Sequence, residues 1–203
     1  MRKETFEKYE SNVRYYCRSI SDVFEYAKGS RMVAENGKQF IDFFSAAGSL
    51  NYGHNNEYIK KKLLEYLTGD YIIQSLDIYT TCKREFIDKL NKILLWPKGY
   101  QYKVQFCGST GTNAIEAALK LARKVTGRKG IFSFMGGFHG VSLGSLAITS
   151  SRSKRFASEI LLNNATFIPF EDNFIEGFDS IEYMEKIFKD DHSGIDKPAA
   201  IIF

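Results

Sequence analysis

The chain has 203 residues, of which 44% are hydrophobic and 26% charged, and its formal net charge is +4. This composition is typical of a soluble globular protein with one domain, or one large domain and a small appendage. No stretch approaches the roughly 20 apolar residues that a membrane span needs. No basic run is longer than Lys60-Lys61-Lys62, so the sequence does not favour a nucleic-acid partner.

The cysteines and histidines are scattered along the chain. The cysteines are Cys17, Cys82 and Cys107, an odd number at distant positions. This spacing predicts neither a disulfide framework nor a zinc site, and we expect no bound metal. Free thiols fit a reducing compartment. The acidic first ten residues are untypical of a secretory signal or transit peptide. We therefore expect a cytoplasmic protein.

The N-terminal segment begins with apolar residues at helical spacing, which predict an amphipathic helix over residues 3–20. A β-hairpin follows, in which Arg31–Ala34 and residues 38–43 flank an Asn36-Gly37 turn. Residues 45–56 read as a loop that carries Tyr52 and His54. Binding residues often lie on such loops, although a plain connection is the more common outcome.

Two further helices are expected, over residues 57–68 and 81–95, and Pro97 ends the second. Each has an apolar face that we expect to point inward. The predicted inward residues are Ile59, Leu63, Tyr66 and Leu67 in the first helix, and Cys82, Phe86, Leu90, Ile93 and Leu94 in the second.

Beyond residue 100, strands alternate with helices. The predicted strands are residues 102–107, 130–134, 166–169 and 199–203. The predicted helices are residues 113–126, roughly 141–150, and 179–190. This alternation indicates an α/β fold with a largely parallel sheet. The last strand stops at Phe203 without a following helix, so we expect this chain to be the N-terminal part of a longer protein.

The turn from Gly108 to Thr112 lies between a predicted strand and an alanine-rich helix. Glycines let the backbone approach an anion, and the helix N-terminus offers unpaired N–H groups. The spacing is neither that of a P-loop nor that of a dinucleotide fingerprint. Two readings stay open at this point: a phosphate site, and a well-capped helix in which Asn113 and Glu116 form a capping box.

A second glycine-rich loop, GGFHG at residues 136–140, follows the next predicted strand. Ligands of open parallel sheets bind beyond the carboxyl ends of the strands, so both loops are expected at one edge. Phe138 could stack on a flat ring, with His139 beside it. The sequence GVSLG also matches the nucleophile elbow of serine hydrolases, with Ser142 as nucleophile. That elbow needs a serine directly after a strand, which is not the expected position here.

These motifs resemble the class III (ornithine/GABA-type) aminotransferases, which are fold-type I enzymes dependent on pyridoxal 5′-phosphate. The segment GTNAIEAALKLAR (residues 111–123) is similar to the cofactor-phosphate motif of that family, and residues 138–140 are similar to its aromatic-His-Gly loop. Within the family, the likeness is greatest to the diaminobutyrate–2-oxoglutarate subfamily of ectoine biosynthesis. It rests on NYGHNN (51–56), TTCKREF (80–86), YKVQF (102–106) and residues 117–128.

The resemblance implies a role for several residues. Thr110, Gly111 and Thr112 would hold the cofactor phosphate, with Ser109 at a position where the subfamily commonly has proline. Phe138 would stack on the pyridine ring, with His139 beside it, and Tyr52 would lie near the substrate entrance. The Schiff-base lysine and the aspartate that pairs with the pyridine nitrogen are expected beyond Phe203. Lys120 and Lys124 lie on the helix after the turn and cannot substitute.

The activity that the resemblance implies is transamination between L-glutamate and L-aspartate 4-semialdehyde, which gives L-2,4-diaminobutyrate and 2-oxoglutarate. Residues 1–50 would belong to a small domain, and residues 51–203 to the first part of the large cofactor-binding domain. We expect a homodimer for the whole protein and no activity from this chain alone. The alternatives are another class III aminotransferase (ornithine/GABA-type or siderophore-pathway), a noncatalytic remnant that binds a partner subunit, and the hydrolase with Ser142.

Overall fold

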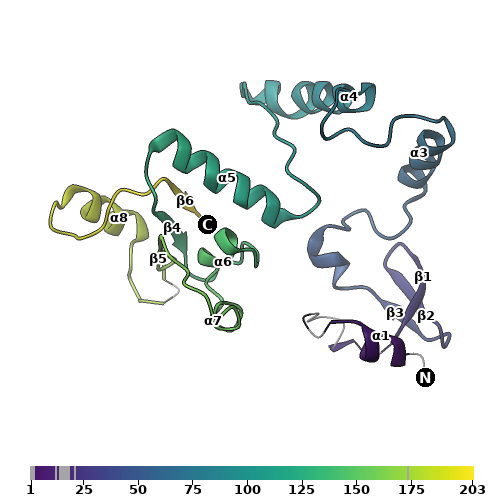
Figure 1. The fold of residues 1–203 in the computed structure, drawn as a ribbon, viewed down its shortest axis with the longest axis horizontal. Coiled ribbons are helices and arrows are strands. Elements are labelled where there is room, and N and C mark those ends of the chain that lie inside the picture. The colour runs from purple at the N-terminus through teal and green to yellow at the C-terminus, as the bar shows by residue number, and fades with distance from the viewer. Residues whose placement is uncertain (1–2, 12, 14–18, 21, 173) are drawn as a thin grey trace. The chain divides into compact units, whose positions relative to one another are not determined.

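The structure is a computed structural model that describes residues 3–11, 13, 19–20, 22–172 and 174–203. The chain forms two compact units, Met1–Lys83 and Arg84–Phe203 (Figure 1). An antiparallel sheet lies in the first unit, and a parallel sheet with flanking helices lies in the second. The predicted α/β class is therefore confirmed for the second unit.

The first unit contains the predicted hairpin. Its elements are α1 (Glu4–Tyr9), β1 (Phe24–Lys28), β2 (Arg31–Ala34) and β3 (Gln39–Ile41), and the sheet order is β1-β2-β3. At the turn, Gly37 has a φ of 82°, and the side chain of Asn36 accepts the backbone N–H of Lys38 at 3.0 Å. Strand β1 was not predicted. The predicted helix over residues 3–20 lies partly outside the described residues.

Helix α3 (Glu57–Thr68) has the predicted bounds, and the side chain of Asn56 caps it by accepting the N–H of Ile59 at 3.2 Å. The helix predicted over residues 81–95 is instead a series of three helical segments. They are α4 (Thr81–Leu90), the π-helical turn η2 (Asn91–Leu95) and the 3-10 turn η3 (Trp96–Lys98). Pro97 has no N–H with which to continue the helix, and Gly99 ends it with a φ of 73°.

The inward faces predicted for these helices are not buried. Ile59 is 48% exposed, Leu63 is 55% exposed and Phe86 is 51% exposed. Neither α3 nor α4 contains a buried residue. Periodicity identifies the apolar face of a helix, but burial requires another element to pack on that face. The described elements leave these faces about half exposed, so this prediction was wrong.

The second unit is built on a parallel sheet with the strand order β5-β4-β6. Its strands are β4 (Ile131–Phe134), β5 (Ala165–Ile168) and β6 (Ala200–Ile202). Ile131 is paired with Ala165 on one side and with Ala200 on the other. Three of the four predicted strands are thus confirmed. Because the strands are parallel, their carboxyl ends meet at one edge of the sheet.

The fourth predicted strand, residues 102–107, is wrong. Within the described chain this segment belongs to no sheet. Its side chains make ring contacts instead: Tyr102 stacks on Tyr100 with centroids 5.0 Å apart, and Phe106 packs against Phe86 at 5.8 Å. Alternating apolar residues favour an extended backbone, but a strand also needs a hydrogen-bonded neighbour.

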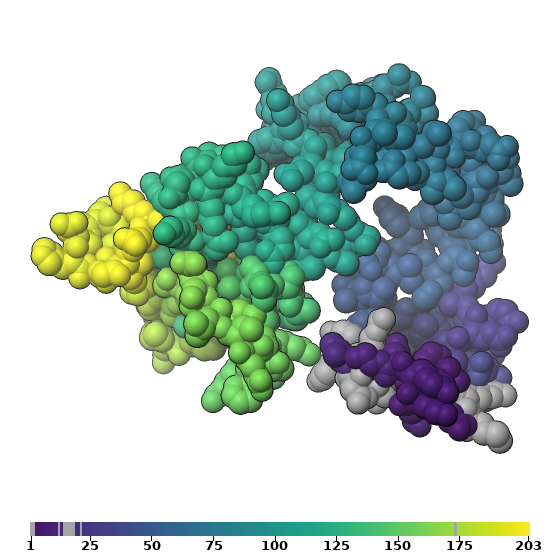
Figure 2. All heavy atoms as spheres, viewed as in Figure 1, coloured from purple at the N-terminus to yellow at the C-terminus, as the bar shows by residue number. Residues whose placement is uncertain are grey.

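The core lies on both faces of the central strand β4. On one face, Ile131 packs with Leu119 of α5 (Gly111–Thr126) and with Ile148. On the other face, Phe132 packs with Met184 of α8 (Ser180–Lys189) and with Ile168. Adjacent strand residues point to opposite faces, so β4 is covered on both sides. Helix α8 and the turn after it, yellow in Figure 2, lie at one end of this unit.

The helix predicted over residues 141–150 is shorter than expected. Helix α6 covers only Leu143–Ala147, and α7 (Arg152–Phe156), which was not predicted, follows it. The backbone leaves the helix because Ser150 donates its N–H to the carbonyl of Gly137 at 3.0 Å. That bond ties the end of the segment back to the glycine-rich loop after β4.

Candidate functional site

The turn ahead of α5 forms the first part of the candidate site. Gly108 has a φ of 134°, and the side chain of Asn113 occupies the space that a Cβ would need there. Thr110 is the N-cap, but its side chain makes no capping hydrogen bond. In the part of the chain that the structure describes, no group accepts a hydrogen bond from the backbone N–H of Gly111 or Thr112. The turn therefore offers free donors at the positive end of a 16-residue helix.

Glu116 does not form the predicted capping box. The N-cap is Thr110 rather than Asn113, so Glu116 lies in the second turn of α5. Its carboxylate instead accepts the hydroxyl of Ser142 at 2.5 Å and the backbone N–H of Ser145 at 3.0 Å. Burial opposes ionisation, but these bonds and one from the backbone N–H of Gly144 outweigh it and lower the pKa of Glu116. An ionised carboxylate thus links α5 to α6.

A cluster of hydroxyl groups joins the turn to the segment after β4. The Oγ1 of Thr112 lies 2.8 Å from the Oγ of Ser142 and 2.6 Å from the Oγ of Ser145. Gly140, with a φ of 126°, lies so close that a Cβ there would meet the side chains of Thr112 and Ser145. The structure therefore brings together the two glycine-rich loops. Because the hydroxyl of Thr112 already has partners, its backbone N–H is the group left for an anion.

Phe138 and His139 lie on a loop that forms two hydrogen bonds with the side chain of Thr149. The N–H of His139 donates to the Oγ1 of Thr149 at 3.0 Å, and this hydroxyl donates to the carbonyl of Gly140 at 2.9 Å. The Phe138 side chain is 61% exposed, so its face is available to a ligand. Burial lowers the pKa of His139, and its Nε2 is buried without a hydrogen-bond partner among the described residues. An unpaired buried nitrogen is costly, so a polar group bound there would be stabilising.

Tyr52, the predicted substrate residue, lies in the first unit on a loop with strained backbone. Residues 45–47 all have positive φ, a conformation that costs about 1–2 kcal/mol per non-glycine residue. Asp42 holds the loop by accepting the N–H of Ser45 at 2.8 Å and by pairing with Nε2 of His54 at 2.9 Å. These bonds lower the pKa of Asp42. Tyr52 itself is exposed, and its role at the entrance of a site stays a prediction.

The surroundings of Ser142 do not support the hydrolase interpretation. Ser142 is the N-cap of α6 and does not directly follow a strand. Its hydroxyl is bonded within the cluster of Glu116, Thr112 and Ser145. None of its hydrogen bonds within the described residues involves a histidine. A serine nucleophile needs a base to take its proton; the acceptor of the Ser142 hydroxyl is Glu116, whose lowered pKa makes it a poor base.

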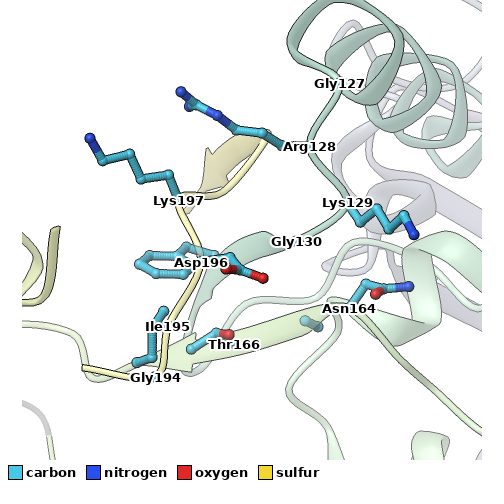
Figure 3. Close-up of a pocket in the computed structure, with 12 residues that line it drawn as sticks. Gly127, Arg128, Lys129, Gly130, Asn164, Thr166, Gly194, Ile195, Asp196 and Lys197 are labelled. Atoms are coloured by element: carbon cyan, nitrogen blue, oxygen red, sulfur yellow. The ribbon is translucent and has the colours of Figure 1, made fainter. Parts of the chain in front are cut away.

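A separate cavity of about 740 Å³ lies at the opposite edge of the sheet, where β4 and β5 begin. Basic residues surround it, but Figure 3 shows Lys129 on the other side from Arg128 and Lys197, so the three charges do not converge. Asp196 also lines the cavity. In open parallel sheets ligands bind at the carboxyl ends of the strands. This cavity is therefore not the candidate site.

The turn and the aromatic loop together fit a ligand that has an anionic group and a flat ring. The turn supplies the N–H groups of Gly111 and Thr112 and the exposed hydroxyl groups of Ser109 and Thr110. The loop supplies the face of Phe138 and the unpaired nitrogen of His139. Among the described residues, no group of three or more His, Cys, Asp or Glu side chains could hold a metal ion. In the same residues, no helix has the length and apolarity to cross a membrane.

Comparison with known families gives a match over almost the whole chain. The model of the family described as aminotransferase class-III matches residues 17–203. A diaminobutyrate–2-oxoglutarate transaminase from Bordetella parapertussis is 50% identical over 97% of this chain and 45% of its own length. One from Halalkalibacterium halodurans is 51% identical over 97% of this chain and 46% of its own length. The chain thus spans about half the length of the curated relatives it matches.

Other similarities are less specific about the substrate. An aminotransferase from Sinorhizobium fredii, described as uncharacterized, is 50% identical over 97% of this chain and 44% of its own length. Among solved structures, taurine:2-oxoglutarate aminotransferase from Bifidobacterium kashiwanohense has a TM-score of 0.78 at 21% identity, and covers 98% of this chain and 46% of its own. Ornithine aminotransferase from Toxoplasma gondii has a TM-score of 0.74 at 16% identity, with 97% and 43% covered. At such identities these structures indicate a shared fold.

Proposed function

Because the chain belongs to the class III aminotransferase family, we propose that residues 1–203 supply the phosphate-binding part of a pyridoxal 5′-phosphate-dependent transaminase. The observation that carries the proposal is the junction between the two loops. Thr112 lies within hydrogen-bond distance of Ser142 and Ser145, so the α5 N-terminus and the Phe138 loop adjoin. A phosphate and an aromatic ring of one molecule can then be bound side by side.

The residues of the turn fit the phosphate of this cofactor, and Phe138 fits its ring. We assign the phosphate to the turn, where Gly111 and Thr112 contribute backbone N–H groups and Ser109 and Thr110 contribute exposed hydroxyls. The positive end of the α5 dipole favours the phosphate charge. Phe138 would cover one face of the ring. When bound, the cofactor supplies an electron sink for reactions at the amino acid carbon.

His139 would lie beside the ring in its neutral form. Its pKa is lowered by burial, so near pH 7 the imidazole carries no charge that would compete for the phosphate. Its backbone N–H is already bound to Thr149 at 3.0 Å, which fixes the orientation of the loop. The role of His139 would thus be to orient neighbouring groups, and Tyr52 would act at the substrate entrance.

We further propose the substrates L-glutamate and L-aspartate 4-semialdehyde, with L-2,4-diaminobutyrate and 2-oxoglutarate as products. This assignment is supported by the names of relatives that are about 50% identical over 97% of the chain. Ectoine biosynthesis is the corresponding pathway, in a cytoplasmic homodimer. The uncharacterized Sinorhizobium relative has the same identity, so an ornithine/GABA-type or siderophore-pathway enzyme is the second candidate.

The first test is binding by the 203-residue chain. Pyridoxal 5′-phosphate should bind in equilibrium dialysis, inorganic phosphate should compete with it, and pyridoxal, which lacks the phosphate, should bind at least tenfold more weakly. Equal binding of pyridoxal and its phosphate would contradict the phosphate role of the turn. We expect no turnover by this chain alone, because the family resemblance places the lysine that would hold the cofactor covalently outside residues 1–203.

The second test addresses the substrate. Residues 1–203 would replace the matching segment of the Bordetella parapertussis transaminase, with the parent enzyme as the control. The chimera should transfer amino groups between L-glutamate and L-aspartate 4-semialdehyde with a kcat/KM within tenfold of the parent. A preference for ornithine or 4-aminobutyrate would overturn the diaminobutyrate assignment but keep the family. A folded chimera that holds the cofactor but transfers no amino group would favour the noncatalytic, subunit-binding alternative.

A further inference from the structure

Helix α6 is capped at its N-terminus by a carboxylate from another helix. The first N–H groups of any helix lack partners within it. The usual solution is the side chain of the N-cap residue, which here is Ser142, but Ser142 makes no capping bond. Its hydroxyl instead donates to Glu116 at 2.5 Å, and Glu116 accepts the N–H of Ser145 at 3.0 Å and that of Gly144. Glu116 of α5 therefore accepts the N–H groups of α6 that an N-cap side chain would otherwise accept.

The carboxylate of Glu116 lies close to the backbone of α6 at Gly144. A Cβ on Gly144 would meet the carboxylate of Glu116, with 3.0 Å to its Cδ. A glycine at this position is thus what allows the carboxylate to approach the helix. The pKa of Glu116 is lowered even though burial opposes ionisation, because the converging donors favour the charged form. At neutral pH the contact is therefore made by an ionised carboxylate.

At its other end, α6 is capped by Arg155 of α7. One guanidinium nitrogen donates to the carbonyls of Leu146 at 3.2 Å, Ala147 at 2.7 Å and Thr149 at 3.2 Å. Opposite charges at the two ends both suit the helix dipole. A helix of five residues is too short to be stable by itself. Its position is therefore set by its neighbours, and two of these, Glu116 and Thr112, belong to α5.

Helix α6 is connected by hydrogen bonds both to the N-terminus of α5 and, through Thr149, to the loop of Phe138 and His139. Ser145 of α6 lies 2.6 Å from the hydroxyl of Thr112. Thr149, just beyond the helix, accepts the N–H of His139 at 3.0 Å and donates to the carbonyl of Gly140 at 2.9 Å. A displacement of α6 would thus move the loop that carries Phe138 relative to the N-terminus of α5.

We propose that Glu116 is a positioning residue: by fixing α6, it keeps the Phe138 loop at a constant distance from the N-terminus of α5. The phosphate and the ring of one cofactor are then bound together. This inference rests on the proposed function. Glu116 differs in this respect from the residues that contact the phosphate. Loss of Glu116 should weaken the binding only of ligands that contact both the turn and the Phe138 loop.

The test compares two ligands in the wild-type chain, in E116A, and in I168V as a stability control. Ile168 of β5 is buried in the cluster formed with Phe132 and Met184, so I168V weakens the core without removing a hydrogen bond of the Glu116 contact. In E116A the Kd for pyridoxal 5′-phosphate should rise about tenfold, while the Kd for inorganic phosphate stays within twofold. I168V should change neither Kd by more than twofold. Hydrogen exchange at the amides of Gly144 and Ser145 should accelerate in E116A alone.

The outcomes separate the two proposals. If the wild-type chain binds pyridoxal 5′-phosphate and E116A binds it equally tightly, the positioning role of Glu116 is overturned and the proposed function stands. If both ligands weaken by the same factor in E116A, Glu116 acts on the phosphate turn, which also overturns the positioning role. If the wild-type chain binds neither ligand, the proposed function fails, and this inference fails with it. As a second variant, E116Q keeps the side-chain length without the charge and should fall between wild type and E116A.

Discussion

Replacing Gly140 by alanine should destabilise the second unit more than the same replacement at Gly136, in the same loop. Both glycines have positive φ, 126° and 89° respectively. The two positions differ in what surrounds them. A Cβ at Gly140 would lie 2.7 Å from the Oγ of Ser145 and 2.7 Å from the Cβ of Thr112, whereas no atom lies within 4 Å of a Cβ at Gly136. G136A is therefore a matched control for the backbone strain.

The expected magnitude has two parts. An alanine with positive φ costs on the order of 1–3 kcal/mol, and both variants share this cost. Only G140A must also push apart the helix α5 and the segment of Ser145, and forcing atoms into a packed site costs about 1–3 kcal/mol. The free energy of unfolding should thus be lower in G140A than in G136A by about 1–3 kcal/mol. For a chain of this size, 1 kcal/mol corresponds to a Tm shift of about 2–4 °C.

Urea denaturation followed by circular dichroism measures this difference, with calorimetry as a second method. Both variants should keep the wild-type secondary structure before the transition. The decisive quantity is the difference between the variants, since strain that is common to them cancels. If G140A and G136A lost the same stability, the two loops would not be in close contact at Gly140, and the junction on which the proposed site rests would be refuted.

Three further variants test other parts of the structure. The folded-state pKa of Glu116 lies below its ordinary 4.5, so the ionised carboxylate stabilises the folded state at neutral pH, and this stabilisation is lost as the pH falls through the folded pKa. The difference in unfolding free energy between wild type and E116Q should therefore shrink below about pH 4.5. A difference that stays constant with pH would argue against an ionised cap. F138A should change stability by less than about 0.5 kcal/mol, since the ring is 61% exposed, but should weaken pyridoxal 5′-phosphate severalfold in dialysis; unchanged affinity would remove Phe138 from the site. D42A releases the N–H of Ser45 and the ring of His54, so limited proteolysis should cut residues 45–56 faster, and wild-type resistance would contradict the anchoring role.

Features that depend on neighbours in the chain could be predicted from the sequence. The Asn36-Gly37 turn sets the hairpin because Gly37 tolerates a positive φ and the Asn36 side chain accepts the N–H of Lys38. Asn56 caps α3 within the same turn, so the predicted bounds of that helix are confirmed. The buried strands β4, β5 and β6 show short apolar runs between turn residues, and these too are local signals.

Features that depend on distant partners could not be predicted. Residues 102–107 have an extended pattern but no paired strand in the described chain. The apolar faces of α3 and α4 were identified correctly as apolar, yet Leu63 and Phe86 are about half exposed. Strand β1 was missed because its pattern of half-buried residues is irregular, and its register is interrupted between Phe24 and Tyr26.

The candidate site divides in the same way. The sequence alone was enough to predict that Gly108–Thr112 precedes a helix and that Phe138 and His139 follow the next strand, because both signals lie in consecutive residues. The role of Glu116, by contrast, depends on how the helices pack in the fold. Its spacing from Asn113 suggested a local cap, but its carboxylate is bonded to Ser142 and Ser145, 26 and 29 residues away. A hydrogen-bond acceptor has no local signature when its donors come from another helix, and the packing of α5 against α6 selects them.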